Sequence, residues 1–282
     1  MGRRESLNDT EIEIMRRLQD GKMSVSGLAA ALSISPAWAS ECVSHLSETG
    51  FVDREKKGTG VTVGMSQSPI GTAASFLIRE NAMLKLEAVL TGSGLKILML
   101  VQKPGCDSRS IAARASISLR TARGVLARWR GMGILTLKDG VYAINPAHTT
   151  LSAFARSWAE HINSAILKEK YPNAVIVWQW RDEFIFTSDG RVSDDSFKPA
   201  GPTRLEELNY DIIGRTFYYQ YRPDGEEVSE AEALVQTVMI DPLNPRPLRH
   251  LRNAKVSKAE LAKFAEKYGL KLDLKNGGMQ LG

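Results

Sequence analysis

The sequence predicts a mainly α-helical chain in which a helical unit with a small β hairpin occurs twice, followed by an α+β domain. Two observations predict this fold class. The segment Leu-Ala-Ala-Ala-Leu-Ser-Ile-Ser at residues 28–35 returns as Ile-Ala-Ala-Arg-Ala-Ser-Ile-Ser at residues 111–118, an offset of 83 residues. After residue 146 the chain changes to short aromatic stretches separated by turns that contain Pro and Gly. A repeat at a fixed offset indicates one supersecondary unit used twice.

Composition is that of an ordinary globular protein. With 282 residues the chain is long enough for two or three domains, and its hydrophobic share of 43% is typical. No run approaches the roughly 18 apolar residues that cross a bilayer, and the first five residues lack the apolar stretch of a signal peptide. Cys42 and Cys106 are too few for a disulfide framework or a metal cluster. We therefore expect a soluble cytoplasmic protein without metal or cofactor.

The positive charge is concentrated in one part of the chain. The net charge of +5 divides into −1 for residues 1–70, +7 for residues 71–146 and −1 for residues 147–282. The middle segment holds 11 Lys and Arg against 4 Asp and Glu. A localised basic excess is expected where a protein meets a polyanion, so this segment is the candidate for binding nucleic acid.

The first unit is expected over residues 1–67. Three helices are expected here. Asn8 and Glu11 form a capping box at the start of the first helix, which ends at Gly21, and Ser24 caps the second. Ser35 caps the third, with Pro36 at its first position, and Gly50 follows its end. Residues 51–57 and 61–65 then predict two strands around a tight turn. The order helix, turn, helix and hairpin is therefore expected.

The second unit is expected over residues 93–146. Residues 68–92 connect the two units, with a break at residues 68–71 and one connecting helix from Thr72 to Leu90. Ser108 and Ser118 are expected to cap its second and third helices, and a shorter hairpin turns at Lys138-Asp139-Gly140. The apolar spacing i, i+4, i+7 predicts matching core positions in the two units: Ala39, Val43 and Leu46 in the first, and Ala122, Leu126 and Trp129 in the second.

The third helix of the second unit carries the candidate binding residues. The face opposite its core positions holds Leu119, Arg120, Thr121, Arg123, Gly124, Ala127 and Arg128. Arginine can hold guanine with two hydrogen bonds and also pairs with phosphate, and Gly124 leaves room for close approach. Arg109, at the start of the preceding helix, and Lys138, at the hairpin tip, are expected to meet phosphates. The alternative is that these cations are only solvated.

The equivalent helix of the first unit has a different face, made of Pro36, Ala37, Trp38, Ser40, Glu41 and Ser44. It has no arginine, and Glu41 would repel phosphate unless it accepts a hydrogen bond from a cytosine amine. The hairpin of this unit carries Arg54, Lys56 and Lys57. Trp38 is expected to be exposed, where it packs on thymine methyls or marks a protein interface. His45 is interpreted as a polar surface residue, and contact of this unit with DNA is left open.

Both units resemble the winged-helix regulators of the MarR and ArsR type. The residues that carry the resemblance are Leu28-Ala29-Ala30 before the turn, Ser35 as the cap, the segment Leu-Ser-Glu-Thr-Gly-Phe-Val at residues 46–52, and residues 118–135 in the second unit. The resemblance covers about half of the chain. It implies two winged-helix domains with small β wings that bind DNA, although some winged helices bind proteins instead.

The α+β domain is expected over residues 147–282. Its elements are predicted as a helix over 148–170, strands over 174–180 and 183–187, a loop over 193–203, a strand over 216–221, and helices capped by Ser229 with Glu232 and by Ser257 with Glu260. The alternating aromatic residues are expected to leave one set exposed as a partner or dimer surface.

No catalytic motif is found in this domain. Its acidic residues are scattered and are expected to be solvated in turns: Asp182, Glu183, Asp189, Asp194, Asp195 and Asp211. His148, His161 and His250 are too dispersed to suggest a metal site. A Gly-rich phosphate loop and a nucleophile motif are both missing from the sequence, so no enzymatic activity is predicted.

Residues 229–246 and 256–270 form a capped helix, an Asp-Pro and Asn-Pro-Arg turn, and a second capped helix. This pattern is similar to the C-terminal region of archaeal tandem winged-helix regulators, which in turn resemble AbiEi-like abortive-infection antitoxins. The resemblance implies repression of an operon and counteraction of a nucleotidyltransferase-like toxin.

The sequence leaves three candidate functions for this protein. The first is a sequence-specific DNA-binding transcriptional regulator that uses tandem winged helices. The second is an antitoxin-like interaction protein that counteracts a nucleotidyltransferase-type toxin and autoregulates its operon, and the third is an enzyme built on the α+β domain. The expected partners are double-stranded DNA, a second copy of the chain and a toxin-like protein, with no membrane.

Overall fold

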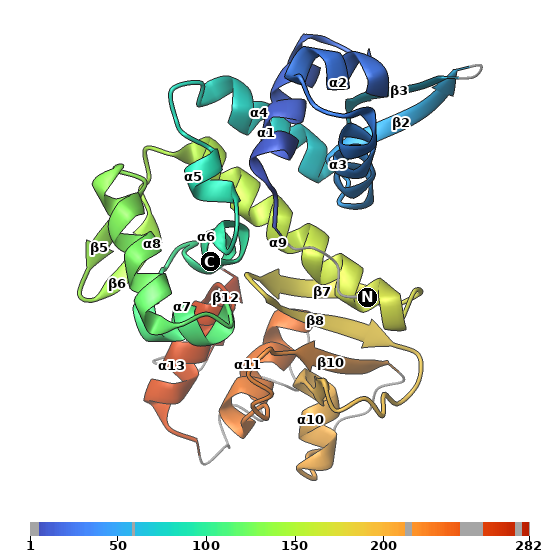
Figure 1. The fold of residues 1–282 in the computed structure, drawn as a ribbon. Helices are drawn as coiled ribbons and strands as arrows, with labels where there is room; N and C mark the ends of the chain where they lie inside the picture. Colours follow the sequence, from blue (N-terminus) through green and yellow to red (C-terminus); the bar gives the residue numbers. More distant parts are fainter. Residues whose placement is uncertain (1–5, 58–59, 212–215, 243–255, 274–277, 282) are drawn as a thin grey trace. The chain divides into compact units, whose positions relative to one another are not determined.

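The computed structural model describes residues 6–57, 60–211, 216–242, 256–273 and 278–281, with the backbone alone for Lys57 and for residues 272–273 and 278–281. The chain forms two compact units, Met1–Ile162 and Asn163–Gly282 (Figure 1). Helices alternate with small antiparallel sheets, which confirms the predicted fold class. Over the described residues no helix is long and apolar enough to cross a membrane.

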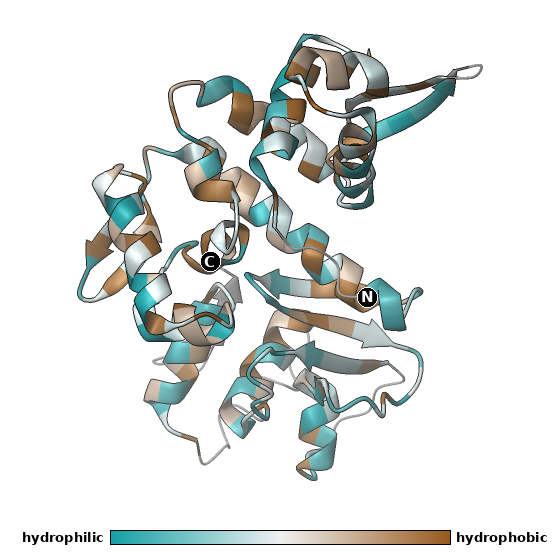
Figure 2. Cartoon of the chain, in the orientation of Figure 1, coloured by the Kyte–Doolittle hydropathy of each residue, from teal (hydrophilic) through white to brown (hydrophobic). Residues whose placement is uncertain are grey.

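The first winged helix begins with the predicted capping box. The Asn8 side chain accepts from the Glu11 N–H at 2.9 Å, and Glu11 accepts from the Asn8 N–H at 2.8 Å. Its elements are α1 (Asp9–Arg17), the 3-10 turn η1 (Leu18–Asp20), β1 (Met23–Ser24), α2 (Val25–Leu32), α3 (Pro36–Glu48), β2 (Val52–Lys57) and β3 (Gly60–Met65). Ser24 and Ser35 cap α2 and α3 as predicted. The β2–β3 hairpin is the wing, and its strand β2 is strongly hydrophilic (Figure 2).

The second winged helix reproduces the first at the offset of the sequence repeat. Its elements are α6 (Gly94–Leu100), β4 (Cys106–Asp107), α7 (Ser108–Arg114), α8 (Leu119–Gly131), β5 (Leu135–Lys138) and β6 (Val141–Ile144). Helix α8 begins and ends 83 residues after α3, and the strand orders β1-β3-β2 and β4-β6-β5 are equivalent. The turns before α3 and α8 both contain a left-handed serine, Ser33 with φ 54° and Ser116 with φ 55°.

Two details of the helices differ from the prediction. Asp107, rather than Ser108, caps α7, because its carboxylate accepts from the N–H groups of Arg109 and Ser110. The connecting segment is two helices, α4 (Pro69–Glu80) and α5 (Glu87–Leu90), not one. The break occurs at Asn81, whose side chain donates to the Leu77 carbonyl at 3.0 Å. An asparagine that bonds nearby backbone groups competes with continuation of a helix.

The long helix α9 (Thr149–Lys170) contributes its first half to the first unit. Phe154 and Trp158 of this helix stack on Phe51, at the entrance to the first wing, with ring centroids 6.2 and 5.7 Å apart. Gln102, which follows α6, donates to the Ala155 carbonyl at 3.2 Å. One continuous hydrophobic core therefore includes residues of both winged helices and of α9.

The second unit is built on an antiparallel sheet of order β7-β8-β10-β9. Its elements are β7 (Val175–Trp180), β8 (Glu183–Ser188), β9 (Phe197–Pro199), α10 (Gly201–Glu207), β10 (Phe217–Tyr221), α11 (Glu230–Ile240), α13 (Lys258–Lys267), β11 (Leu270–Asp273) and β12 (Gly278–Leu281). The predicted loop over 193–203 contains β9 and the start of α10, and the β11–β12 hairpin was not predicted. Ser229 and Ser257 cap α11 and α13 as predicted.

Candidate nucleic-acid interface

Helix α8 has one buried face and one basic face. Ala122, Leu126 and Trp129 are fully buried, as their spacing predicts. The outer face exposes four arginines: Arg120, Arg123, Arg128 and Arg130. Arg130 was not among the predicted site residues, although its place directly after the buried Trp129 is a signal that puts it on the outer face.

The N-terminal turn of α8 is fixed by its cap. The Ser118 hydroxyl accepts from the Thr121 N–H at 3.0 Å and lies 2.7 Å from the Thr121 hydroxyl. Leu119, which was predicted on the outer face, is half-buried and packs against the core of the unit. The cap therefore holds the exposed Arg120 and Arg123 in the first turns of a regular helix, which is the part of a recognition helix that contacts base edges.

Few acidic groups compete for these cations. Residues 93–146 contain two carboxylates, Asp107 and Asp139. Asp107 is used by the α7 cap, and its hydrogen bond from Ser110 holds the pKa of the carboxyl below its usual value. Over the described residues, Arg120 and Arg123 form no ion pair. Their charge is therefore available to an external anion.

Arg128 has an internal partner as well as an exposed side chain. Its guanidinium donates to the Ala88 carbonyl in α5 at 3.2 Å, and the Trp129 indole N–H donates to the same carbonyl at 3.0 Å. The neighbouring Glu87 pairs with Arg16 of α1. Helix α5 therefore joins α8 of the second winged helix to α1 of the first.

Two further predicted cations are exposed, one before α8 in the sequence and one after it. Arg109 lies in the first turn of α7, whose N-terminus is held by Asp107. Lys138 ends β5 at the second wing, where Asp139 and Gly140 turn the chain with φ of 51° and 80°. These positions lie at the start of the helix before α8 and at the wing tip, as the sequence predicts.

Gly124 lies in the middle of α8 and is exposed. A Cβ built at this position meets no atom within 4 Å, so packing within the protein does not require glycine here. Glycine inside a helix costs about 0.5–1 kcal/mol relative to alanine. The space over this part of the helix is open, as it also is at Gly131.

The equivalent face of the first winged helix is neutral to acidic. Trp38, expected to be exposed, is half-buried, packs against the core and donates from its indole N–H to the Thr10 hydroxyl at 3.3 Å. Ala37 and Ser40 stand where the second copy has Arg120 and Arg123. The exposed Glu41 replaces Gly124. The two repeats thus share a backbone but not a binding face.

The remaining predicted residues of the first winged helix lie near its wing. Pro36 is exposed at the start of α3, and Lys56 is exposed on β2. Arg54 donates to the half-buried Ser44 hydroxyl at 3.1 Å, which ties the wing to α3. The Lys57 side chain lies outside the described residues.

His45 was expected on the surface, but its side chain is largely buried and forms a hydrogen-bond contact with Glu11. Its Nδ1 lies 2.7 Å from the Glu11 carboxylate, and the side chains are 12% and 1% exposed. Glu11 accepts from the Asn8 N–H as well. Glu11 of the α1 capping box therefore also contacts α3. The spacing of these residues along the sequence does not reveal this contact.

The aromatic residues of the second unit are covered on both sides of its sheet. Phe184, Phe186 and Tyr219 form one cluster with Leu167 of α9, whereas Trp178 and Tyr218 pack on the opposite side against the core of α11 and α13. The eight aromatic residues of the two central strands and β7 are all buried or half-buried. The expectation that one aromatic set remains exposed as a partner face is therefore wrong, because helices pack on both faces.

A buried polar network at one end of this sheet includes Glu183, which was predicted to be solvated, whereas Asp189, Asp195 and Asp211 are exposed as predicted. Glu232 pairs with Arg222 and with Lys267 at 2.9 Å each, and Lys267 also pairs with Glu183 at 2.8 Å. The Tyr268 hydroxyl donates to Glu232 at 2.7 Å. Burial is the larger cause and the negative charge of Glu232 the next, and both raise the pKa of the tyrosine. Arg222 also lies 3.5 Å from Asp224 and 3.3 Å from Glu226, so four carboxylates surround the two cations, and the network ties α11 and α13 to β8 and to the end of β10.

Asp182 and Glu183 are therefore buried, contrary to prediction, at 8% and 4% exposure. The hairpin between β7 and β8 turns at Arg181, which has φ 57°. The Arg181 carbonyl accepts from the buried Asn163 amide at 3.0 Å. This contact holds the turn against the part of α9 that belongs to the second unit. The sequence pattern alone indicates a turn that is exposed to solvent.

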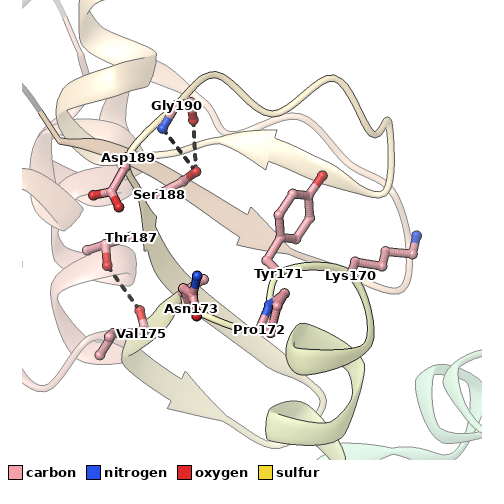
Figure 3. A pocket seen from close by; sticks show the side chains of 10 residues that line it. Lys170, Tyr171, Pro172, Asn173, Val175, Thr187, Ser188, Asp189 and Gly190 are labelled. Carbon is pink, nitrogen blue, oxygen red and sulfur yellow. Dashed lines mark hydrogen bonds between the residues drawn. The ribbon is translucent and has the colours of Figure 1, made fainter.

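A pocket of about 350 Å³ lies at the end of α9, between the start of β7 and the end of β8 (Figure 3). Its polar side chains largely bond within the protein: Ser188 donates to the Gly190 carbonyl at 2.8 Å, and Lys170 donates to Asp194. The Lys170 and Ser196 contacts lower the pKa of Asp194 to about 2. The ten lining residues present no paired nucleophile and base, and the described residues hold no group of three or more metal-binding side chains.

Comparison with known proteins gives little to add. No family model matches the chain, and no curated protein matches it. Among solved structures, reduced HlyU from Vibrio cholerae N16961 is 24% identical with a TM-score of 0.24, covering 26% of this chain and 78% of that chain. HlyU from the same strain gives 24% identity and a TM-score of 0.25, covering 27% of this chain and 82% of that chain.

Proposed function

We propose that this protein binds double-stranded DNA through its second winged helix and acts as a transcriptional regulator. The observation that carries the proposal is the pair Arg120 and Arg123, exposed in the first turns of α8 and free of ion pairs over the described residues. A recognition helix places these turns at base edges in the major groove. Arginine at such a position holds guanine with two hydrogen bonds.

The surrounding cations supply the sequence-independent part of binding. Arg109 and Lys138 flank the helix in the chain, and residues 71–146 carry a net charge of +7. Lys and Arg contacts to phosphate position a protein on the duplex without reading sequence. Gly124 then allows the helix to approach the groove closely, because no side chain stands between its backbone and the bases.

The first winged helix has a structural part in this proposal. Its α3 lacks arginine and exposes Glu41, which is unfavourable next to phosphate. Its core is continuous with that of the second winged helix, and Arg16 pairs with Glu87 of the helix that also contacts α8. We propose that it orients the second copy, and that its wing residues Arg54 and Lys56 add phosphate contacts.

A paired mutation tests the proposal directly. Replacing both Arg120 and Arg123 by Ala should weaken binding at least tenfold, because each base-contacting arginine is worth roughly 1–3 kcal/mol. The measurement is a gel-shift titration on duplexes that the wild-type chain selects from a random pool. The matched control replaces Arg54 and Lys56 by Ala, which removes the same charge from the first wing and should cost less. A double α8 variant within about threefold of wild type would exclude α8 as the reading helix.

A further inference from the structure

The side chains of α8 offer one kind of hydrogen-bonding chemistry to a ligand. The helix reads Leu-Arg-Thr-Ala-Arg-Gly-Val-Leu-Ala-Arg-Trp-Arg-Gly over residues 119–131 and contains no Asp, Glu, Asn or Gln. Its one hydroxyl group, on Thr121, lies 2.7 Å from the Ser118 hydroxyl that caps the helix. The other exposed polar side chains of α8 are arginines, which donate hydrogen bonds and accept none.

The four DNA bases differ in what their major-groove edges offer to a donor. Guanine presents two acceptors, O6 and N7, whereas adenine presents one acceptor beside a donor. Thymine presents one acceptor beside a methyl group, and cytosine presents a donor. A guanidinium group can therefore make two hydrogen bonds to guanine and no more than one to any other base. A reading surface that carries donors alone selects guanine.

Arg120 and Arg123 lie in the first two turns of α8, which is the part of a recognition helix that contacts base edges. Three residues correspond to about 4.5 Å along a helix axis and to roughly 60° around it. Successive bases along a DNA strand are about 3.4 Å apart. When the helix lies along the groove, the two guanidinium groups therefore reach different base pairs that are adjacent or next-adjacent.

We propose that α8 recognises two guanines at adjacent or next-adjacent base pairs through their major-groove edges, one with Arg120 and the other with Arg123. This inference rests on the proposed function and adds the base that the site reads. The equivalent positions in α3 are Ala37 and Ser40, which have no guanidinium group. One such pair of guanines is therefore expected in the binding site for each bound chain.

The two remaining exposed arginines of α8 lie outside the reading turns. Arg128 and Arg130 are roughly 8 and 11 Å beyond Arg123 along the helix axis, and the Arg128 guanidinium donates to the Ala88 carbonyl at 3.2 Å. Arg130 is exposed on the same helix and carries the same charge. It is therefore a matched control for the effect of losing one arginine from α8.

The test begins with the full-length wild-type chain and a random pool of duplexes, from which bound sequences are recovered and sequenced. The selected duplexes should share two guanines with at most one base pair between them. Each guanine is then replaced in turn by 7-deazaguanine, which pairs with cytosine but has a C–H group in place of the N7 acceptor. Binding should weaken about fivefold or more at either position, because a two-bond contact to guanine is lost.

Inosine at the same two positions is the matched control on the DNA. It keeps O6 and N7 in the major groove and lacks only the amino group in the minor groove, so binding should change less than with 7-deazaguanine. These measurements use the wild-type chain and do not depend on the folding of a variant.

Protein variants then assign each guanine to its arginine. Arg120→Ala and Arg123→Ala should each lose the preference for guanine at one position and keep it at the other. Arg130→Ala should keep the preference at both positions. Circular dichroism should show the same folding in all three variants.

Selected duplexes without such a pair of guanines would overturn the inference, and so would full binding with 7-deazaguanine at both positions. A loss of preference in Arg130→Ala, with none in Arg120→Ala and Arg123→Ala, would also overturn it. In each of these cases the chain still binds duplex DNA, and the proposed function stands. A wild-type chain that retains no duplex from the pool would remove the proposed function itself, and the inference with it.

Discussion

Gly124 in the middle of α8 has open space where a side chain would be. Gly124→Ala should therefore stabilise the free protein by up to about 1 kcal/mol, because alanine favours the helix. The same methyl group should weaken DNA binding if the helix backbone approaches the bases. Chemical denaturation and gel-shift titration measure the two effects. Gly131→Ala is the control, since Gly131 ends α8 with equally open space. Equal affinity in wild type and Gly124→Ala would show that DNA does not use this space.

Individual residues show where prediction from sequence stops. The caps Asn8, Ser24, Ser35 and Ser118 were correct, because each accepts from the N–H three residues later. Trp38 and His45 were misjudged, because their partners Thr10 and Glu11 lie in another helix about 30 residues earlier. Helical spacing separates inner from outer faces, but it does not show which outer residues a neighbouring helix covers.

The contrast between α3 and α8 gives a quantitative expectation for binding. The cations that the proposal assigns to phosphates are four exposed side chains, Arg109 and Lys138 of the second winged helix and Arg54 and Lys56 of the first. Each phosphate contact contributes about −0.9 to the slope of log affinity against log salt, so a slope between roughly −3 and −4 is expected. Gel-shift titrations at several ionic strengths provide the slope. A value near zero would mean that phosphates are not contacted, and would favour protein binding by the winged helices.

Repeated elements were predicted better than single ones. The helices α3 and α8 confirm the repeat to the residue at both ends, because cap, core spacing and closing glycine agree twice. The break at Asn81 was missed, since the side chain that interrupts the helix also depends on Thr150, almost 70 residues later. Strand β9 was missed because its three residues are held by pairing with β10 rather than by local propensity. The antitoxin-like resemblance of the last domain stays a prediction, and residues 243–255 of that pattern lie outside the described residues.

At the scale of the whole molecule, charge and cores are divided between the two units. The first unit holds the basic excess and packs both winged helices around one continuous core. Residues 147–282 have a net charge of −1 and contain the buried ion-pair network around Glu232, Lys267 and Arg222. The electrostatic term that dominates non-specific DNA affinity is therefore expected from the first unit alone.

The central claim is that α8, and not its repeat α3, lies in the groove of DNA. Ala127 in α8 and Ala37 in α3 are both exposed alanines on the outer faces of equivalent helices. A photo-crosslinking amino acid placed at either position in the full-length chain, mixed with duplex DNA and irradiated, compares the two helices under the same conditions. The account predicts a protein–DNA adduct from position 127 and none above background from position 37. An adduct from position 37 without one from position 127 would contradict it.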